Sequence, residues 1–256
     1  MAEWDPSVYQ RYKAQRDRPS LDLLLQIPRD LEPAQIWDLG CGTGEQAAVL
    51  AARHPGAMVH GLDSSESMLA VARERPAAVD WRLGDIAAFA PEVPPDLMFT
   101  NAALQWLPDH QVLFPRLAAA LAPGGVFACQ MPIAHEGRWR ALLSETAADP
   151  RWAERLAGVE RIAILPDAAY YDLLSPTCEV DIWSTRYLHV LEGEDAVLEW
   201  TRGSSLRPYL ERLGDRAGAF EAAFAARLRD AYPRREDGTT LMAFPRLFIV
   251  ARRFDA

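Results

Sequence analysis

The stretch Asp38-Leu39-Gly40-Cys41-Gly42-Thr43-Gly44-Glu45 decides the fold. It follows a short β-type run at 35–39 and opens a helix-like segment at 45–53. Glycine permits a sharp turn and lets a ligand lie against bare backbone. The helix that follows offers backbone N–H groups and the positive end of a dipole. The stretch therefore predicts a strand–turn–helix unit that binds a nucleotide-like ligand.

The spacing of the glycines narrows the class of ligand. A dinucleotide fingerprint that starts at Gly40 needs its third glycine where this chain has Glu45. Asp38 places a negative charge where a pyrophosphate would bind poorly, whereas a ligand with an ammonium and a sulfonium group suits that carboxylate. Both features disfavour a nicotinamide oxidoreductase.

Two further acidic residues stand at the ends of predicted strands. Asp63, in Gly61-Leu62-Asp63-Ser64-Ser65, ends the second strand, where its carboxylate can accept both hydroxyls of a ribose. Helix capping there belongs more naturally to Ser64 or Ser65. Asp85 ends the third strand and can accept from an adenine amino group or cap the short helix after it. Together with Asp38, these residues predict an adenosine-bearing ligand at the carboxyl edge of the sheet.

Composition fits one α/β domain, or one such domain with a modest insertion. Half of the 256 residues are hydrophobic, and no run of about 18 apolar residues exists that would span a membrane. The start of the chain lacks the features of a signal peptide, so we expect a cytoplasmic protein. The net charge of −9 argues against a nucleic-acid partner. The three cysteines and five histidines are scattered, so reduced thiols and no metal site are predicted.

Alternating β-type and helix-like segments predict a doubly wound, mostly parallel sheet of seven strands in a Rossmann-like fold, with a helical cap insertion. The expected strands are 35–39, 58–63, 79–84, 96–100, 126–131, 179–191 and 241–253. We expect an N-terminal helical arm at 1–30, an α/β core at 31–134, a helical cap at 135–178 and completing strands at 179–256, the last interrupted by a helical excursion at 194–232.

These motifs, in their order along the chain, resemble those of class I S-adenosylmethionine-dependent methyltransferases. More narrowly, nearly the whole chain resembles the trans-aconitate 2-methyltransferase family. That resemblance rests on Trp4-Asp5-Pro6 with Tyr9 and on the segments 101–110, 129–132 and 200–210. The chain departs from the family pattern at Thr43-Gly44-Glu45-Gln46, beside the expected cofactor, where the family has Pro-Gly and smaller polar residues.

The resemblance implies transfer of a methyl group from S-adenosylmethionine to a carboxylate of a small polycarboxylic acid, most closely trans-aconitate. The products would be the monomethyl ester and S-adenosylhomocysteine. A carboxylate is already ionised at pH 7, so alignment and desolvation are expected rather than a catalytic acid or base. The residues expected at the cofactor are Asp38, Gly40, Cys41, Gly42, Gly44, Asp63, Ser64, Met68, Asp85, Ile86 and Asn101. Those expected at the substrate are Gln105, Trp106, His110, Trp200, Arg202, Arg207 and Tyr209, with Arg16 or Arg18 as a further cation.

Several alternatives stay open from the residues themselves. The acceptor of the methyl group can be another free acid, a malonyl group on a carrier protein, or a quinone carbon, because the glycine turn says nothing about it. A protein that binds the nucleoside without turnover is a third reading. Arginines on helices usually belong to a solvated face, and Trp106 and Trp200 are the kind of residue that more often packs in a core.

Overall fold

The computed structural model describes residues 13–159, 164–202 and 205–255. Trp4 and Tyr9, which entered the family resemblance, lie outside the described residues, as does the side chain of Arg16.

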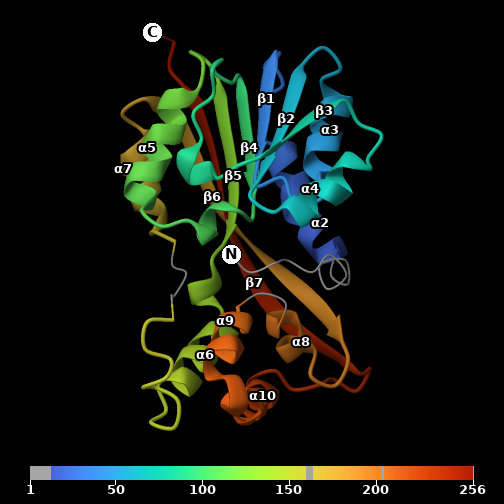
Figure 1. The fold of residues 1–256 in the computed structure, drawn as a ribbon, viewed down its shortest axis with the longest axis vertical. Helices are drawn as coiled ribbons and strands as arrows, with labels where there is room; N and C mark the ends of the chain where they lie inside the picture. The colour runs from blue at the N-terminus through green and yellow to red at the C-terminus, as the bar shows by residue number, and fades with distance from the viewer. Residues whose placement is uncertain (1–12, 160–163, 203–204, 256) are drawn as a thin grey trace. The chain divides into compact units, whose positions relative to one another are not determined.

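A seven-stranded sheet organises the chain (Figure 1), with strand order β3-β2-β1-β4-β5-β7-β6. The first five strands are parallel: β1 (Gln35–Leu39), β2 (Met58–Asp63), β3 (Val79–Leu83), β4 (Leu97–Asn101) and β5 (Val126–Pro132). The strand β7 (Thr239–Arg253) runs antiparallel to β5, and β6 (Cys178–Glu192) lies at the edge. The predicted doubly wound, mostly parallel sheet is thereby confirmed.

Helices cover both faces of this sheet. Figure 1 shows α2 (Lys13–Leu24), α3 (Glu45–Arg53) and α4 (Glu66–Arg73) on one side, with α5 (His110–Ala120) and α7 (Asp167–Leu174) on the other. Strands such as β1 and β4 are buried almost throughout because both of their faces are covered. Two short 3-10 turns, η1 (Ile86–Ala88) and η2 (Leu104–Trp106), follow β3 and β4 at the edge where the parallel strands end.

The chain divides into two compact units. Unit 1 comprises 1–132, 164–185 and 246–256, and unit 2 comprises 133–163 and 186–245. The long strands β6 and β7 each contribute residues to both units. The segment 135–178, expected as one helical cap, is divided between them, because Tyr170 of α7 packs on Phe114 of α5 with ring centroids 4.6 Å apart.

Unit 2 is helical around the second half of β6 and the first half of β7. It contains α6 (Arg138–Ala147), α8 (Ala196–Arg202), α9 (Arg207–Leu213) and α10 (Ala217–Ala231), with the short turns η3 (Ala134–Glu136) and η4 (Gly214–Arg216). Phe220 of α10 packs edge-on to Trp152, with ring centroids 5.7 Å apart. The hydroxyl of Tyr232 accepts from the backbone N–H of Trp139 at 2.9 Å, which ties α6 to the end of α10.

No helix among the described residues is long and apolar enough to cross a bilayer.

Candidate functional site

The glycine turn between β1 and α3 has a conformation that side chains would not allow. Gly40, Gly42 and Gly44 have φ angles of 77°, 56° and 82°, in the left-handed region that glycine adopts without strain. A Cβ atom on Gly40 would lie 2.3 Å from Cβ of Ala103 and 3.6 Å from Cδ1 of Ile86. The turn is therefore pressed against η1 and the segment after β4, which places three loops at one edge of the sheet.

Asp63 joins the end of β2 to this turn. Its Oδ2 accepts from the backbone N–H of Gly42 at 2.8 Å, and its Oδ1 accepts from the N–H of Ser65 at 2.8 Å. Ser65, not the exposed Ser64, caps α4, and its hydroxyl accepts from the N–H of Met68 at 3.4 Å. A carboxylate offers about four lone-pair sites, so Asp63 keeps acceptor capacity for a ligand while it shapes the turn.

Asp38 is a buried carboxyl group beneath the turn. Its side chain belongs to a residue only 2 % exposed, and its Oδ2 has no hydrogen-bond partner among the described residues. Burial, followed by repulsion from Asp63, raises the pKa of Asp38 to about 8, although the N–H of Ala47 acts in the opposite direction. An orphaned acidic oxygen at this position fits a ligand that brings a positive charge.

Asp85 and Cys41 have roles that their sequence context left open. Asp85 is exposed and caps η1, where its Oδ1 accepts from the N–H of Ala87 at 2.8 Å. The capping alternative for Asp85 is thus realised, and a contact with adenine remains an expectation. Burial, with repulsion from Asp38, raises the pKa of the Cys41 thiol, so this group stays protonated and is no nucleophile.

The segment after β4 carries open polar atoms on a strained backbone. Ala102 has φ 54°, a left-handed conformation that costs a non-glycine residue about 1 kcal/mol. It is held there by its N–H, which donates to the carbonyl of Gln130 at 2.9 Å, and by Nε2 of Gln105, which donates to its carbonyl at 2.6 Å. Oδ1 of Asn101 and Oε1 of Gln105 are buried without a partner in the described part of the chain. Strain of this kind is typical of ligand sites.

His110, expected at the substrate, lies in the core with both ring nitrogens engaged. Nδ1 is 2.6 Å from the hydroxyl of Tyr170, and Nε2 is 2.9 Å from the carbonyl of Leu104. Burial lowers the pKa of His110, so the neutral ring donates from Nε2 and accepts at Nδ1. The histidine therefore anchors η2, the turn that carries Gln105 and the 40 % exposed Trp106.

Strand register brings the acidic residues and Asn101 to one face of the sheet. Asp38 is in register with Gly61 of β2 and with Phe99 of β4. Asp63 and Asn101 stand two residues further along those strands, and side chains two residues apart in a strand share a face. All three polar side chains therefore belong to the face on which Asp38 lies.

The same face continues across β5 and β7. Asn101 is in register with Gln130, and Pro132, two residues on, is in register with Arg246. Nη1 of Arg246 donates to Oε1 of Gln130 at 3.5 Å. We call the resulting set the polar row: Asp63, Asp38, Asn101, Gln130 and Arg246, in the order of their strands across the sheet.

Sequence reasoning did not single out Gln130 and Arg246 as site residues. The signal was present: Gln130 is a polar residue inside the apolar strand 126–131, and Arg246 precedes the apolar run 247–251. Each interrupts a pattern that otherwise indicates a buried strand.

Comparisons with known proteins agree with this fold. A family described as a methyltransferase domain matches residues 36–125. The trans-aconitate 2-methyltransferase of Variovorax paradoxus (strain S110) is 46 % identical over 258 residues, which cover 99 % of both chains. That of Azoarcus sp. (strain BH72) is 46 % identical over 256 residues, covering 99 % of this chain and 100 % of the other. The chain belongs to the trans-aconitate 2-methyltransferase family. It is therefore a methyltransferase.

Solved structures share the fold at low identity. The YcgJ protein of Bacillus subtilis has a TM-score of 0.61 at 14 % identity, over 93 % of this chain and all of that one. A phosphoethanolamine N-methyltransferase 2 of Haemonchus contortus, solved with S-adenosyl-L-methionine, has a TM-score of 0.54 at 18 % identity, over 93 % of this chain and 53 % of that one. Such likeness shows that this family has the methyltransferase fold.

Four of the expected substrate residues belong to unit 2 rather than to the polar row. Trp200 is buried against His189 and Phe244, with ring centroids 4.7 Å and 5.6 Å away. Tyr209 is buried and stacks on Phe220 at 6.0 Å. The two aromatic residues thus take part in the packing of unit 2.

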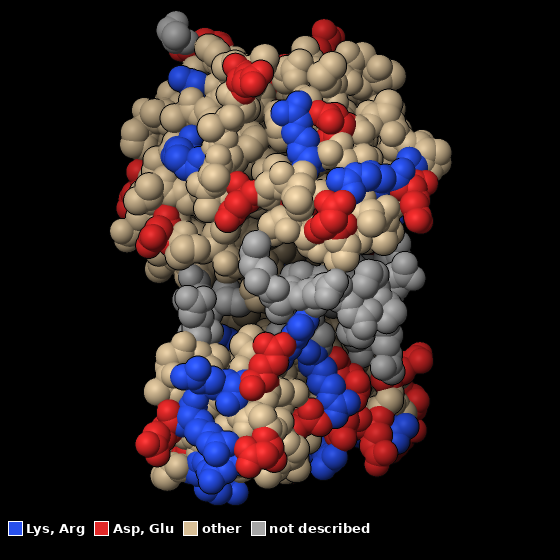
Figure 2. All heavy atoms as spheres, in the orientation of Figure 1, with Lys and Arg blue, Asp and Glu red and all other residues tan. Residues whose placement is uncertain are grey.

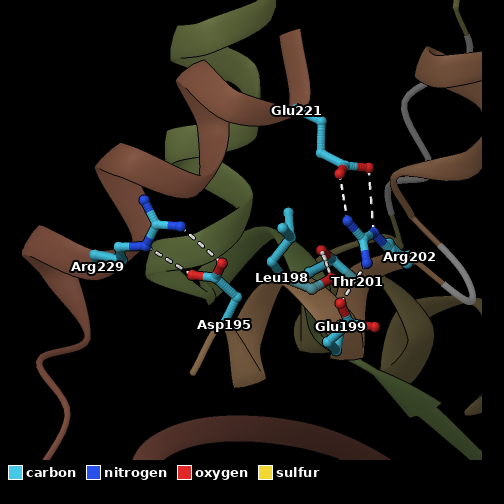
Figure 3. Close-up of polar contacts among 7 residues, drawn as sticks. All are labelled: Asp195, Leu198, Glu199, Thr201, Arg202, Glu221 and Arg229. Carbon is cyan, nitrogen blue, oxygen red and sulfur yellow. Dashed lines mark hydrogen bonds and ion pairs between the residues drawn. The ribbon is translucent and has the colours of Figure 1, made fainter. Parts of the chain in front are cut away.

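The two arginines of that set are held in ion pairs. Arg202 of α8 pairs with Glu199 of its own helix and with Glu221 of α10 (Figure 3), where its Nε donates to Oε2 of Glu221 at 3.1 Å. Arg207 donates from Nε to Oε1 of Glu211, one turn along α9, at 2.6 Å. The guanidinium of Arg202 is thereby occupied by two carboxylates of the chain itself.

Proposed function

We infer that this chain transfers a methyl group from S-adenosylmethionine to a carboxylate of trans-aconitate, giving the monomethyl ester and S-adenosylhomocysteine. The observation that carries this proposal is the identity of 46 % to trans-aconitate 2-methyltransferases over 99 % of both chains. Because the match runs through both units, it includes the regions that distinguish acceptors as well as the glycine turn.

The residues at the carboxyl edge of the sheet fit the methyl donor. S-adenosylmethionine would supply an electrophilic methyl group on a sulfonium centre. The orphaned oxygen of Asp38 suits its positively charged end, and the remaining acceptor capacity of Asp63 suits ribose hydroxyls. The other residues proposed to line the cofactor are Gly40, Cys41, Gly42, Gly44, Ser64, Met68, Asp85, Ile86 and Asn101.

The chemistry asks for placement rather than for proton transfer. The acceptor is a carboxylate that is already ionised at neutral pH, so no general base is needed. The chain has to align an oxygen with the methyl group and remove water from both. The buried members of the polar row, Asp38, Gln130 and Arg246, favour a dry environment. The open oxygen atoms of the amides of Asn101 and Gln105 can accept hydrogen bonds from the ammonium group of the methyl donor.

The proposed partner is a small anionic polycarboxylate, with no role for nucleic acid or membrane. We also infer a cytoplasmic location. Cys41, Cys129 and Cys178 are buried free thiols, as expected of a protein kept in a reducing compartment.

A labelled-methyl assay tests the proposal. Purified protein is given S-adenosylmethionine tritiated in the methyl group together with a panel of acids, and each product is then treated with base. We expect trans-aconitate to be the best acceptor, with the label released as methanol because the product is an ester. A base-stable product would contradict carboxyl methylation. If another acid, a malonyl carrier protein or a quinone reacts instead, the proposal that trans-aconitate is the substrate is contradicted.

A further inference from the structure

Gln130 and Arg246 form a pair of buried donors at one end of the polar row. Gln130 is 0 % exposed and Arg246 is 5 % exposed, although an amide and a guanidinium are among the side chains that most favour water. They lie on adjacent antiparallel strands at diagonal positions, and Nη1 of Arg246 reaches Oε1 of Gln130 at 3.5 Å. Burying two such groups requires that their polar atoms be used.

The contact between them fixes which way the amide of Gln130 points. A guanidinium only donates hydrogen bonds, so the oxygen of Gln130 faces Arg246 and the amide nitrogen faces away. That Nε2 atom is buried and has no acceptor within the part of the chain that the structure describes. A fully buried N–H group without an acceptor is costly and calls for an explanation, such as a ligand oxygen.

The chemistry of the pair matches a carboxylate. A guanidinium carries five N–H donors in a planar fork, so Arg246 can hold the oxygen of Gln130 and a carboxylate at the same time. A carboxylate beside it could also accept from Nε2 of Gln130. Two donors of this kind, one charged and one neutral, recognise an anion that has been removed from water.

The charges along the polar row are sorted. Asp63 and Asp38 stand on β2 and β1, whereas Arg246 stands on β7, three strands away from β1. With strand spacings of about 4.8 Å, β1 and β7 are about 14 Å apart across the sheet. A cationic ligand is favoured at the acidic end and an anionic ligand at the basic end, with Asn101 on the strand between them.

We propose that Gln130 and Arg246 form the subsite that binds a non-reacting carboxylate of the acid and thereby selects polycarboxylates over monocarboxylates. The identity of the ligand rests on the proposed function; the subsite itself rests on the buried pair. A carboxylate anchored here leaves a second carboxylate of the same molecule toward Asn101 and the middle of the row, where the methyl group would be received. The acid is thus oriented by the group that does not react.

Gln130→Glu is the sharpest test, because it changes one atom of the amide and places a carboxylate of the protein beside Arg246. That internal anion competes with the substrate for the guanidinium. We expect KM for trans-aconitate to rise at least 30-fold, with the Kd for S-adenosylhomocysteine within twofold of wild type and no fall in Tm. Arg252→Gln is the matched control: Arg252 lies on the same strand but pairs with Asp30 at 2.8 Å, and its loss should leave KM unchanged. An unchanged KM in Gln130→Glu would overturn the subsite.

A ligand series adds a readout that a merely structural role would not move. Glutaconate, methylfumarate and itaconate each lack a different one of the three carboxylates of trans-aconitate. The wild-type protein should disfavour all three relative to trans-aconitate. In Gln130→Glu, the preference for trans-aconitate over the analogue that lacks the carboxylate bound by Arg246 should fall to within about threefold. Arg246→Gln should show the same loss of preference. Survival of all three preferences in both variants would exclude a carboxylate contact.

Binding measured without turnover separates this proposal from the proposed function. Trans-aconitate is titrated calorimetrically into the complex with S-adenosylhomocysteine, for the wild-type protein and for Gln130→Glu. Weaker binding of trans-aconitate to the variant than to the wild type supports the subsite, whether or not any acid is methylated. If no acid is methylated, only the proposed function is overturned. Normal methylation by wild type together with unweakened acid binding in Gln130→Glu overturns the subsite and leaves the function intact.

Discussion

The polar row of unit 1 and the ion pairs of α8 and α10 in unit 2 contain the same kinds of side chain but differ in how their polar groups are satisfied. In unit 2, Arg202 is matched by two glutamates, and Arg229 donates from Nε and Nη2 to both oxygens of Asp195 at 2.7 Å (Figure 3). These residues are partly exposed, and their charges are satisfied within the chain. In the polar row, Asp38, Gln130 and Arg246 are buried, and Oδ2 of Asp38 and Nε2 of Gln130 have no partner among the described residues.

This contrast distinguishes charged residues that form a site from those that only pair with each other. Exposed ion pairs contribute little to stability and are common on surfaces, and Figure 2 shows side chains of both signs intermingled on the face in view. A buried polar group without a partner is rare and costly, so it marks a place where a ligand completes the hydrogen bonding. By this criterion we propose the polar row as the site, and the arginines of α8 and α10 as contacts that hold unit 2 together.

The largest effect that this comparison predicts comes from Gly40→Ala. A Cβ there would meet Cβ of Ala103 at 2.3 Å, on a backbone with φ 77° that alanine rarely adopts. We expect the affinity for S-adenosylhomocysteine, measured by calorimetry, to fall at least ~100-fold, because strain and clash both act on the turn. Gly218→Ala in α10 is the control, since a Cβ on Gly218 meets no described atom within 4 Å and activity should be retained. Affinity within threefold of wild type in Gly40→Ala would show that the turn is not the site.

Asp38→Asn tests the buried carboxyl group through the number of protons released when the ligand binds. The pKa of Asp38 is about 8 in the ligand-free protein, so the group is mostly neutral at pH 7. A cation bound beside Asp38 favours its ionised form, so close to one proton should be released for each ligand bound. Calorimetry in buffers of different ionisation enthalpy measures this number. The variant should release none and bind about 10- to 30-fold more weakly. Equal proton release in both proteins would show that Asp38 does not face the charge.

The same substitution has a signed effect on stability. The pKa of Asp38 rises from 3.8 in the unfolded chain to about 8 in the folded one, so the unfolded chain ionises first. Stability that Asp38 contributes below pH 4 is therefore lost as the pH rises from about 4 to about 8. In the absence of ligand, Asp38→Asn should be more stable than wild type at pH 8, by about 2 kcal/mol in urea unfolding. A variant less stable than wild type at pH 8 would contradict the shift.

The next largest effect is expected for His110, which together with Tyr170 positions η2. His110→Ala removes the donor to the carbonyl of Leu104, and kcat should fall about 10-fold, with the Kd for S-adenosylhomocysteine little changed. Gln can reproduce the Nε2 donor, so His110→Gln should recover much of the rate. The pH–rate profile between 6 and 8 should keep its shape, because burial lowers the pKa of His110 and holds it neutral. Activity that rises as the pH falls would instead indicate a protonated His110 that binds the acid.

Local patterns were sufficient for the elements around the glycine turn. The predicted strands 35–39 and 58–63 and the helix 45–53 are observed as Gln35–Leu39, Met58–Asp63 and Glu45–Arg53. Glycines at Gly40 and Gly44 end the strand and start the helix, and such residues mark boundaries within a few positions of the chain. The sequence left the cap of α4 open between Ser64 and Ser65, and the structure assigns it to Ser65.

Contacts between residues far apart in the chain could not be predicted from the sequence. Gln130 meets Arg246 only because β7 pairs antiparallel to β5, 116 residues away, and no local pattern fixes that register. His110 was expected at the substrate from its place just after the fourth strand, and no local pattern predicts its contact with Tyr170, which lies 60 residues further along. Likewise, no local pattern predicts that Glu221 of α10 pairs with Arg202.

The smallest effect is expected for Arg202→Ala, the variant that tests the other half of the comparison. Arg202 joins α8 to α10 through Glu221, and its loss should lower the stability of the protein by about 0.5–1 kcal/mol in urea unfolding. KM for trans-aconitate should change less than threefold, because the guanidinium is already occupied. Glu221→Gln weakens the same link without removing a cation and should match it in both measurements. Arg207→Ala, in the same assay, tests the expectation from the sequence that Arg207 binds the acid. A tenfold rise in KM for Arg202→Ala, absent from Glu221→Gln, would mean that a charge paired within the chain still serves the substrate, and the criterion that separates the two regions would fail.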